Sequence, residues 1–95
     1  MEQALSRSLY HLQTVQFERK EEEDAFHDLS ERELEVLYEV SLGKTNAEIA
    51  QSLNLAEKTA RNYVSVILEK LQLSNRIELA TYAIKNHLSE RMKPE

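Results

Sequence analysis

The sequence predicts an all-α fold, a domain of four helices preceded by an N-terminal linker helix. Three observations lead to this prediction. Apolar residues recur with helical spacing between residues 31 and 88, cap-forming residues precede most of these stretches, and the chain has one glycine and one proline. Because 95 residues usually form one domain, we assign residues 29–88 to it, residues 1–28 to an acidic linker or partner-docking segment, and residues 89–95 to a short tail.

The first helix of the domain is expected to begin after Ser30 and to run as far as Leu42. Ser30 and Glu33 have the spacing of a capping box, in which each side chain bonds the backbone N–H of the other residue. Gly43, the single glycine of the chain, comes next. We expect it to end the helix in the left-handed conformation, which costs a residue with a Cβ about 1 kcal/mol.

Two further helices follow, a short one over Ala47–Leu53, capped by Thr45 or Asn46, and a longer one over Glu57–Leu71. The longer helix has two distinct faces. Its apolar stripe has the spacing i, i+4, i+7, i+8, i+11 and consists of Ala60, Val64, Ile67, Leu68 and Leu71. The opposite, polar face carries Lys58, Arg61, Asn62, Ser65 and Glu69. The sequence therefore predicts one face for the core and one for solvent or a ligand.

A fourth helix is expected from Arg76 to about Leu88, capped by Ser74 or Asn75. It has two apolar faces, one with Ile77, Ala80, Ile84 and Leu88, the other with Leu79, Tyr82 and Ala83. One face can pack on the domain, and the other then needs a partner. We expect a second copy of the chain to bind there, at an interface formed by Leu79, Tyr82, Ala83 and Asn86.

The net charge of -5 is unevenly distributed along the chain. Residues 1–28 hold three Lys or Arg against seven Asp or Glu, whereas residues 29–95 hold nine against ten. The third helix and the turn after it, residues 57–76, hold four against two and are locally basic. Since DNA affinity depends on where the cations lie rather than on their sum, the acidic total does not exclude DNA binding.

The residue inventory argues against an enzyme. The chain has no cysteine and no Gly-rich phosphate loop, and His11, His27 and His87 lack metal-ligand spacing and a nearby nucleophile. We therefore expect no catalytic, metal-binding or cofactor-binding residues. No apolar run approaches the roughly 20 residues of a membrane span, and residues 1–17 do not have the pattern of a secretory signal, so we expect a cytoplasmic protein without a membrane partner.

The order of these elements is typical of helix-turn-helix DNA binding: a helix, a tight turn, a short helix, a break and a longer helix with a partly basic outer face. From Leu29 to about Leu88 the chain also resembles the LuxR/NarL-type, or GerE-like, DNA-binding domain that forms the effector domain of response regulators. The residues that carry the resemblance are "LSERELEVL", Gly43, "NAEIA" at 46–50, Leu53, Leu55, Thr59, Ile67, "KL" at 70–71 and Arg76.

The resemblance implies a sequence-specific transcription regulator that binds double-stranded DNA as a homodimer, with the third helix in the major groove and the fourth at the dimer interface. The positions that face bases in the family are here Lys58, Arg61, Asn62 and Ser65. The positions that hold phosphates or position the helices are here Lys44, Thr45, Asn46, Thr59, Lys70 and Arg76. Arg61 suits guanine and Asn62 suits adenine at the edges of the major groove.

Four residues depart from the family pattern. Ala56 stands where a serine often caps the third helix, which costs about 1 kcal/mol of capping. Ala60 replaces the usual valine, and Tyr63 replaces a frequent histidine. Gln72 replaces a frequent glycine, so we expect the third helix to end less cleanly and the following turn to be strained.

Residues 1–28 lie outside the resemblance. Leu5, Leu9 and Leu12 have the spacing of a short amphipathic helix, which can dock on a partner or connect an upstream receiver domain to the DNA-binding domain. A standalone regulator is equally compatible with the sequence.

Two other functions stay open. An acidic helix-turn-helix relative can sequester a related regulator by protein–protein pairing. Region 4 of sigma factors, which works with RNA polymerase, shares the first three helices, although the fourth helix favours the LuxR/NarL interpretation.

Overall fold

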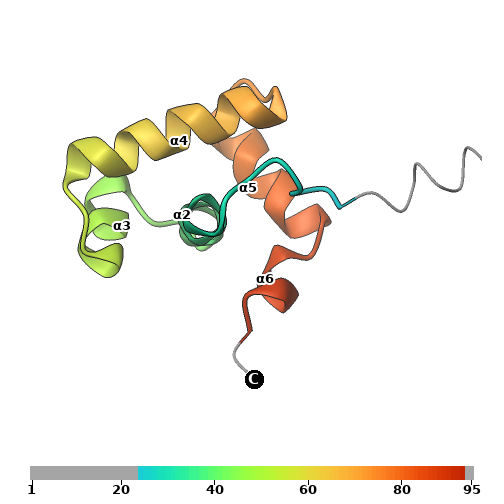
Figure 1. Cartoon of the computed structure of the whole chain (residues 1–95), viewed down its shortest axis with the longest axis horizontal. Helices are drawn as coiled ribbons and strands as arrows, with labels where there is room; N and C mark the ends of the chain where they lie inside the picture. The colour runs from blue at the N-terminus through green and yellow to red at the C-terminus, as the bar shows by residue number, and fades with distance from the viewer. Residues whose placement is uncertain (1–23, 94–95) are drawn as a thin grey trace, which may run out of the picture.

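The computed structural model describes residues 24–93, which form five α-helices and no strand (Figure 1). The helices are α2 (Glu31–Ser41), α3 (Asn46–Leu53), α4 (Glu57–Leu71), α5 (Arg76–Lys85) and α6 (Leu88–Arg91). The predicted all-α fold is confirmed. The expected linker helix around Leu5, Leu9 and Leu12 lies outside the described residues. Within residues 24–93, no helix has the length and apolar character that crossing a membrane requires.

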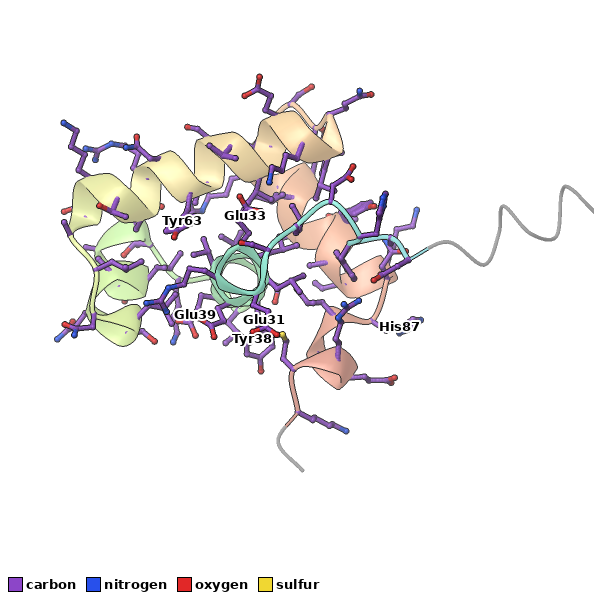
Figure 2. The ribbon with its side chains drawn as sticks, in the orientation of Figure 1. Glu31, Glu33, Tyr38, Glu39, Tyr63 and His87 are labelled. Carbon is purple, nitrogen blue, oxygen red and sulfur yellow. The ribbon has the colours of Figure 1, made fainter. Side chains whose placement is uncertain are left out.

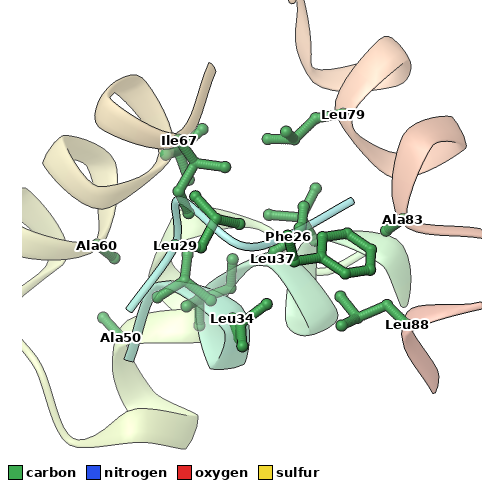
Figure 3. Packing of buried hydrophobic residues seen from close by; sticks show 14 residues of the cluster. Phe26, Leu29, Leu34, Leu37, Ala50, Ala60, Ile67, Leu79, Ala83 and Leu88 are labelled. Atoms are coloured by element: carbon green, nitrogen blue, oxygen red, sulfur yellow. The ribbon is translucent and has the colours of Figure 1, made fainter. Parts of the chain in front are cut away.

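Helix α2 lies at the centre of the domain, where Figure 1 views it along its axis, and α3, α4 and α5 pack around it. Figure 3 shows the apolar side chains that meet between these helices. The largest fully buried side chains are Leu37, Ile49, Ile67, Leu79, Leu88 and Val36. Each of the five helices contributes at least one of them, so the single core orients every helix relative to the others.

Polar caps set the start of α2 and of α5. At α2 the predicted capping box is present: the Glu33 N–H donates to Ser30 Oγ at 3.1 Å, and the Ser30 N–H donates to Glu33 Oε1 at 2.8 Å. At α5 the Asn75 side chain accepts from the Glu78 N–H at 2.9 Å. Helix α4 begins after Ala56 without a side-chain cap, as the sequence predicts.

Three helices end in the same way, at a residue in the left-handed conformation. These residues are Gly43 (φ 83°), Asn54 (φ 59°) and Gln72 (φ 58°). After each of them the next N–H bonds the carbonyl five residues earlier, which forms a Schellman motif: Lys44 to Glu39 at 3.3 Å, Leu55 to Ala50 at 2.8 Å and Leu73 to Leu68 at 2.9 Å. The predicted role of Gly43 is confirmed. The prediction that α4 ends less cleanly is wrong, because the motif forms at Gln72 without a glycine.

The expected fourth helix is divided into two. Helix α5 ends at Lys85 rather than at Leu88, because His87 is left-handed, with φ 58°, and redirects the chain into α6. This turn brings the Leu88 side chain, which is 1% exposed, back against the core (Figure 3). The predicted continuous helix is therefore wrong at its C-terminal end.

The packed domain reaches beyond the expected bounds of residues 29 and 88. Phe26 is buried, and its ring meets the Tyr82 ring edge to face at a centroid distance of 5.7 Å. The Tyr82 hydroxyl donates to the Ala25 carbonyl at 2.7 Å. Arg91 Nη1 donates to both carboxylate oxygens of Asp24, at 2.9 and 2.8 Å. These contacts join the segment before α2 to α5 and α6.

We predict that Gln72→Gly raises the free energy of unfolding by about 1 kcal/mol, because glycine adopts a positive φ without the strain that a Cβ causes. The matched control is Gln51→Gly, which removes the same side chain from an exposed position inside α3 and should lower stability by about 0.5 to 1 kcal/mol. Urea denaturation measures both changes. Destabilisation by both substitutions would show that Gln72 carries no strain.

Candidate nucleic-acid interface

Helix α4 presents a polar face to solvent. Lys58, Arg61, Asn62 and Ser65 are all exposed, and their i, i+3, i+4, i+7 spacing places them along one side of the helix. The buried residues of the opposite side are Ala60, Val64 and Ile67. Within residues 24–93, none of the four polar side chains takes part in a hydrogen bond or ion pair of the domain. In this part of the chain, no other group competes with a ligand for their donors and acceptors.

Lys70, expected at a phosphate or positioning site, joins α4 to the start of α2. Its Nζ donates to Glu33 Oε1 and Oε2 at 2.9 and 3.1 Å and to the Asp28 carbonyl at 3.2 Å. Glu33 is only 7% exposed. Burial acts to raise the pKa of Glu33, but the Ser30 amide and the Lys70 ammonium outweigh it and hold that pKa below its usual value of 4.5. In this structure, Lys70 positions α4.

Arg76 makes a second connection, between the start of α5 and the start of α3. Its Nη1 donates to Asn46 Oδ1 at 2.9 Å, and its Nη2 donates to the Lys44 carbonyl at 2.7 Å. Lys44 Nζ in turn bonds Glu39 Oε1 at 2.8 Å, at the end of α2. The structure thus brings three of the expected residues, Lys44, Asn46 and Arg76, into one network that positions α2, α3 and α5.

The two threonines singled out in the sequence lie at the starts of α3 and α4. Thr45 forms a capping box with Glu48: its Oγ1 accepts from the Glu48 N–H at 3.1 Å, and its N–H donates to Glu48 Oε1 at 2.9 Å. Thr59 is exposed in the first turn of α4, where no side chain caps the helix. The first turn of α4 therefore keeps backbone N–H groups that no side-chain cap occupies.

The α5 face expected to bind a second copy of the chain turns toward the core instead. Leu79 and Ala83 are 0% and 1% exposed, and Tyr82 is half-buried. The exposed apolar residues are on the other face, where Ile77 is 77% and Ile84 is 64% exposed. This corrects the expected interface, because packing on α2 decides which of the two apolar faces of α5 is buried.

A shallow hollow borders the polar face of α4. It has a volume of about 190 Å³ and is lined by Glu33, Thr59, Asn62, Tyr63 and Val66. Figure 2 shows Tyr63 on the side of α4 that faces α2, toward Glu33. Val66 is not among the site residues predicted from the sequence, although its spacing of four residues from Asn62 places it beside the polar face. In the described part of the chain, no three His, Asp or Glu side chains are grouped as a metal site would require.

Comparison with known proteins identifies the family. Residues 27–83 match the family described as "Bacterial regulatory proteins, luxR family", and the match covers more than half of the chain. The chain belongs to the LuxR family. The resemblance inferred from the sequence is therefore confirmed, and the matched range contains α2, α3, α4 and most of α5.

Several regulators are similar to this LuxR-family chain. The "Uncharacterized transcriptional regulatory protein YhcZ" of Bacillus subtilis (strain 168) is 40% identical over 68 residues, which are 72% of this chain and 32% of that protein. The transcriptional regulatory protein DesR of the same organism is 55% identical over 53 residues, 56% of this chain and 27% of DesR. The nitrate/nitrite response regulator protein NarP of Escherichia coli (strain K12) is 43% identical over 56 residues, 59% of this chain and 26% of NarP. The chain thus spans about a third or less of these relatives.

We predict that Glu33 stabilises the domain at neutral pH and that acid removes this contribution. A carboxyl group whose pKa is lower in the folded state stabilises above its unfolded pKa, near 4.5, and the effect is lost as the pH falls through the folded pKa. On acidification from about pH 6 to about pH 3, the melting temperature should therefore fall further in the wild type than in Glu33→Gln.

Two variants serve as controls for this comparison. Lys70→Met should reduce the acid sensitivity in the same way, whereas Lys58→Met, on the same helix but outside the ion pair, should leave it unchanged. Some sensitivity will persist in Glu33→Gln, because the Phe26 amide and Arg91 also lower the pKa of Asp24. Identical acid profiles for the wild type and Glu33→Gln would show that the ion pair does not stabilise the fold.

Proposed function

We propose that this domain binds double-stranded DNA in a sequence-specific manner, with α4 in the major groove, and regulates transcription in the cytoplasm. The observation that carries the proposal is the exposed polar face of α4, whose side chains have no partner among residues 24–93 and which is set on a helix whose opposite side is buried in the core. An α-helix with its side chains is about 10 to 12 Å wide, which matches the roughly 12 Å width of the major groove. Membership of the LuxR family and the names of its relatives as transcriptional regulators support the same function.

The four exposed side chains suit base contacts. The Arg61 guanidinium can donate two hydrogen bonds to O6 and N7 of guanine, and the Asn62 amide can pair with N6 and N7 of adenine. Lys58 and Ser65 flank them on the same side of α4 and can bond base edges or phosphates. Because these side chains have no partners in residues 24–93, binding DNA breaks no contact of the domain.

Phosphate contacts should come mainly from the starts of the helices. Lys44 and Lys70 are paired with carboxylates of the domain itself, so their charges are partly neutralised before DNA arrives, and the donors of Arg76 are engaged by Asn46 and the Lys44 carbonyl. The exposed Thr59 hydroxyl and the N–H groups of the uncapped first turn of α4 remain available to phosphate oxygens. We therefore expect a modest salt dependence for each subunit.

We further propose that two copies bind DNA together through the exposed face of α5. Ile77 and Ile84 leave apolar surface in solvent, beside a hollow of about 450 Å³ whose lining includes Thr81, Lys85 and Asn86. Apolar surface of this kind at the edge of a domain often marks a protein interface. Asn86 thus remains a candidate interface residue, whereas Leu79 and Ala83 do not.

We also propose that this domain acts as the DNA-binding part of a longer regulator. This chain spans about a third or less of relatives such as NarP, which is named a response regulator. An upstream receiver domain could therefore control the DNA-binding domain, with residues 1–28 as the connection and RNA polymerase as the downstream partner.

We predict that Arg61→Ala weakens binding to a duplex selected by the wild type from a randomised library by about 1 to 3 kcal/mol and relaxes the preference at one base pair. The control Lys93→Ala also removes one cation, but Lys93 follows the end of α6, a helix that Figure 1 shows away from α4, and the change should leave the preference unchanged. Fluorescence anisotropy at fixed salt measures both. If Arg61→Ala and Asn62→Ala leave the base preference intact, α4 does not contact the bases, and sequestration of a related regulator explains the acidic domain better.

We predict opposite effects for two neighbouring substitutions on α5. Ile84→Glu should keep the fold and weaken binding of the second copy to DNA, because it places a charge on an exposed apolar face. Ala83→Glu should unfold the domain, because Ala83 is 1% exposed and a carboxylate there would be buried without a partner. Circular dichroism and analytical ultracentrifugation with DNA distinguish the two. If a folded Ile84→Glu variant still binds DNA as two copies, the interface between the copies is not on this face of α5.

A further inference from the structure

One exposed apolar residue lies beside the polar face of α4. In residues 24–93, the large apolar side chains that stay exposed are Leu42, Val66, Ile77 and Ile84. The two isoleucines belong to the α5 face described above, and Leu42 follows the end of α2. Val66 is 39% exposed and is the member of this group that α4 carries. Its neighbours are the residues proposed to contact bases.

The position of Val66 continues the base-contacting side of the helix. It comes four residues after Asn62 and directly after Ser65, so it lies about 6 Å further along the helix axis than Asn62. Successive base pairs of DNA are separated by about 3.4 Å. With α4 in the major groove, Val66 therefore lies within one or two base pairs of the base that Asn62 contacts.

The surroundings of Val66 suit an apolar group of small size. The hollow of about 190 Å³ next to it is lined by Val66, Thr59, the half-buried Tyr63, Asn62 and Glu33. A valine offers no hydrogen bond to a base edge or a phosphate. The major groove presents one exposed apolar group, the C5-methyl group of thymine, and apolar side chains contact it.

We propose that Val66 contacts the C5-methyl group of a thymine and is a specificity-determining residue of the domain. The hollow beside Val66 receives the methyl group, so that both apolar surfaces leave water together. This inference rests on the proposed DNA binding by α4. It adds a preference for thymine, one or two base pairs from the base of Asn62, to the hydrogen-bonded contacts of Arg61 and Asn62.

The test uses the duplex selected by the wild-type protein from a randomised library, with each thymine replaced in turn by deoxyuridine, which lacks only the methyl group. For the wild type, one replacement near the Asn62 contact should weaken binding about three- to fivefold, the effect of burying one methyl group. For Val66→Ala, the same replacement should change the affinity by less than about 1.5-fold, because the partner of the methyl group is gone. Leu42→Ala, which shortens an exposed apolar side chain at the end of α2 rather than on α4, should keep the full wild-type response.

The outcomes separate this inference from the function on which it rests. Thermal melting first confirms that Val66→Ala is folded, as its exposed position leads us to expect. If the wild type selects a specific duplex but no deoxyuridine replacement affects binding, or Val66→Ala keeps the response, the thymine contact is wrong and DNA binding stands. If the wild type selects no specific duplex, the proposed function fails and the contact fails with it.

Discussion

The buried carboxylate of Glu33 connects the central helix α2 to α4, the helix that carries the candidate DNA-contacting face. It completes the capping box that begins α2, and it accepts two hydrogen bonds from Lys70 near the end of α4. A carboxylate that is 7% exposed is costly unless charged and polar partners compensate it, and both partners are present here. The central helix and the candidate DNA-contacting helix are therefore tied together by one side chain, in addition to the core between them.

The cations around α4 and its supporting contacts have two kinds of role. Lys44, Lys70 and Arg76 neutralise or bond groups inside the domain and join its helices to one another. Lys58 and Arg61 stay exposed on the outer side of α4. A net charge of -5 is thus compatible with a positively charged contact face, because the location of the unpaired cations determines the local field. The uncapped start of α4 adds backbone donors at the same end of the helix.

The features that sequence predicted well are local ones. The capping box at Ser30, the cap at Thr45 and the left-handed turn at Gly43 depend on residues within a few positions of each other, and the structure has them. The exposed face of α4 followed from helical spacing in the same way. The predictions that proved wrong for α5 concern features that depend on packing between distant segments. Two apolar faces on α5 gave no basis for choosing the buried one, and the end of that helix at Lys85 goes with the turn at His87 that brings Leu88 into the core.

The partners of the charged residues also could not be predicted from local sequence patterns. Lys70 and Glu33 are 37 positions apart, and Arg76 and Asn46 are 30 apart, so neither pair has a local signature. At Gln72 the local rule itself failed. The chain forms the hydrogen bonds of the helix end there although glutamine is strained in the left-handed conformation. Sequence therefore identified which residues matter around α4 and left their partners to be found in the fold.

The most direct test of α4 as the DNA-contacting helix is an NMR titration of the wild-type chain with its selected duplex, following backbone amide and side-chain shifts. Lys58, Arg61, Asn62 and Ser65 should show the largest changes, together with amides in the first turn of α4, while α6 should change little. Large changes confined to α5 and α6, with the Arg61 and Asn62 side-chain signals unmoved, would contradict major-groove binding by α4.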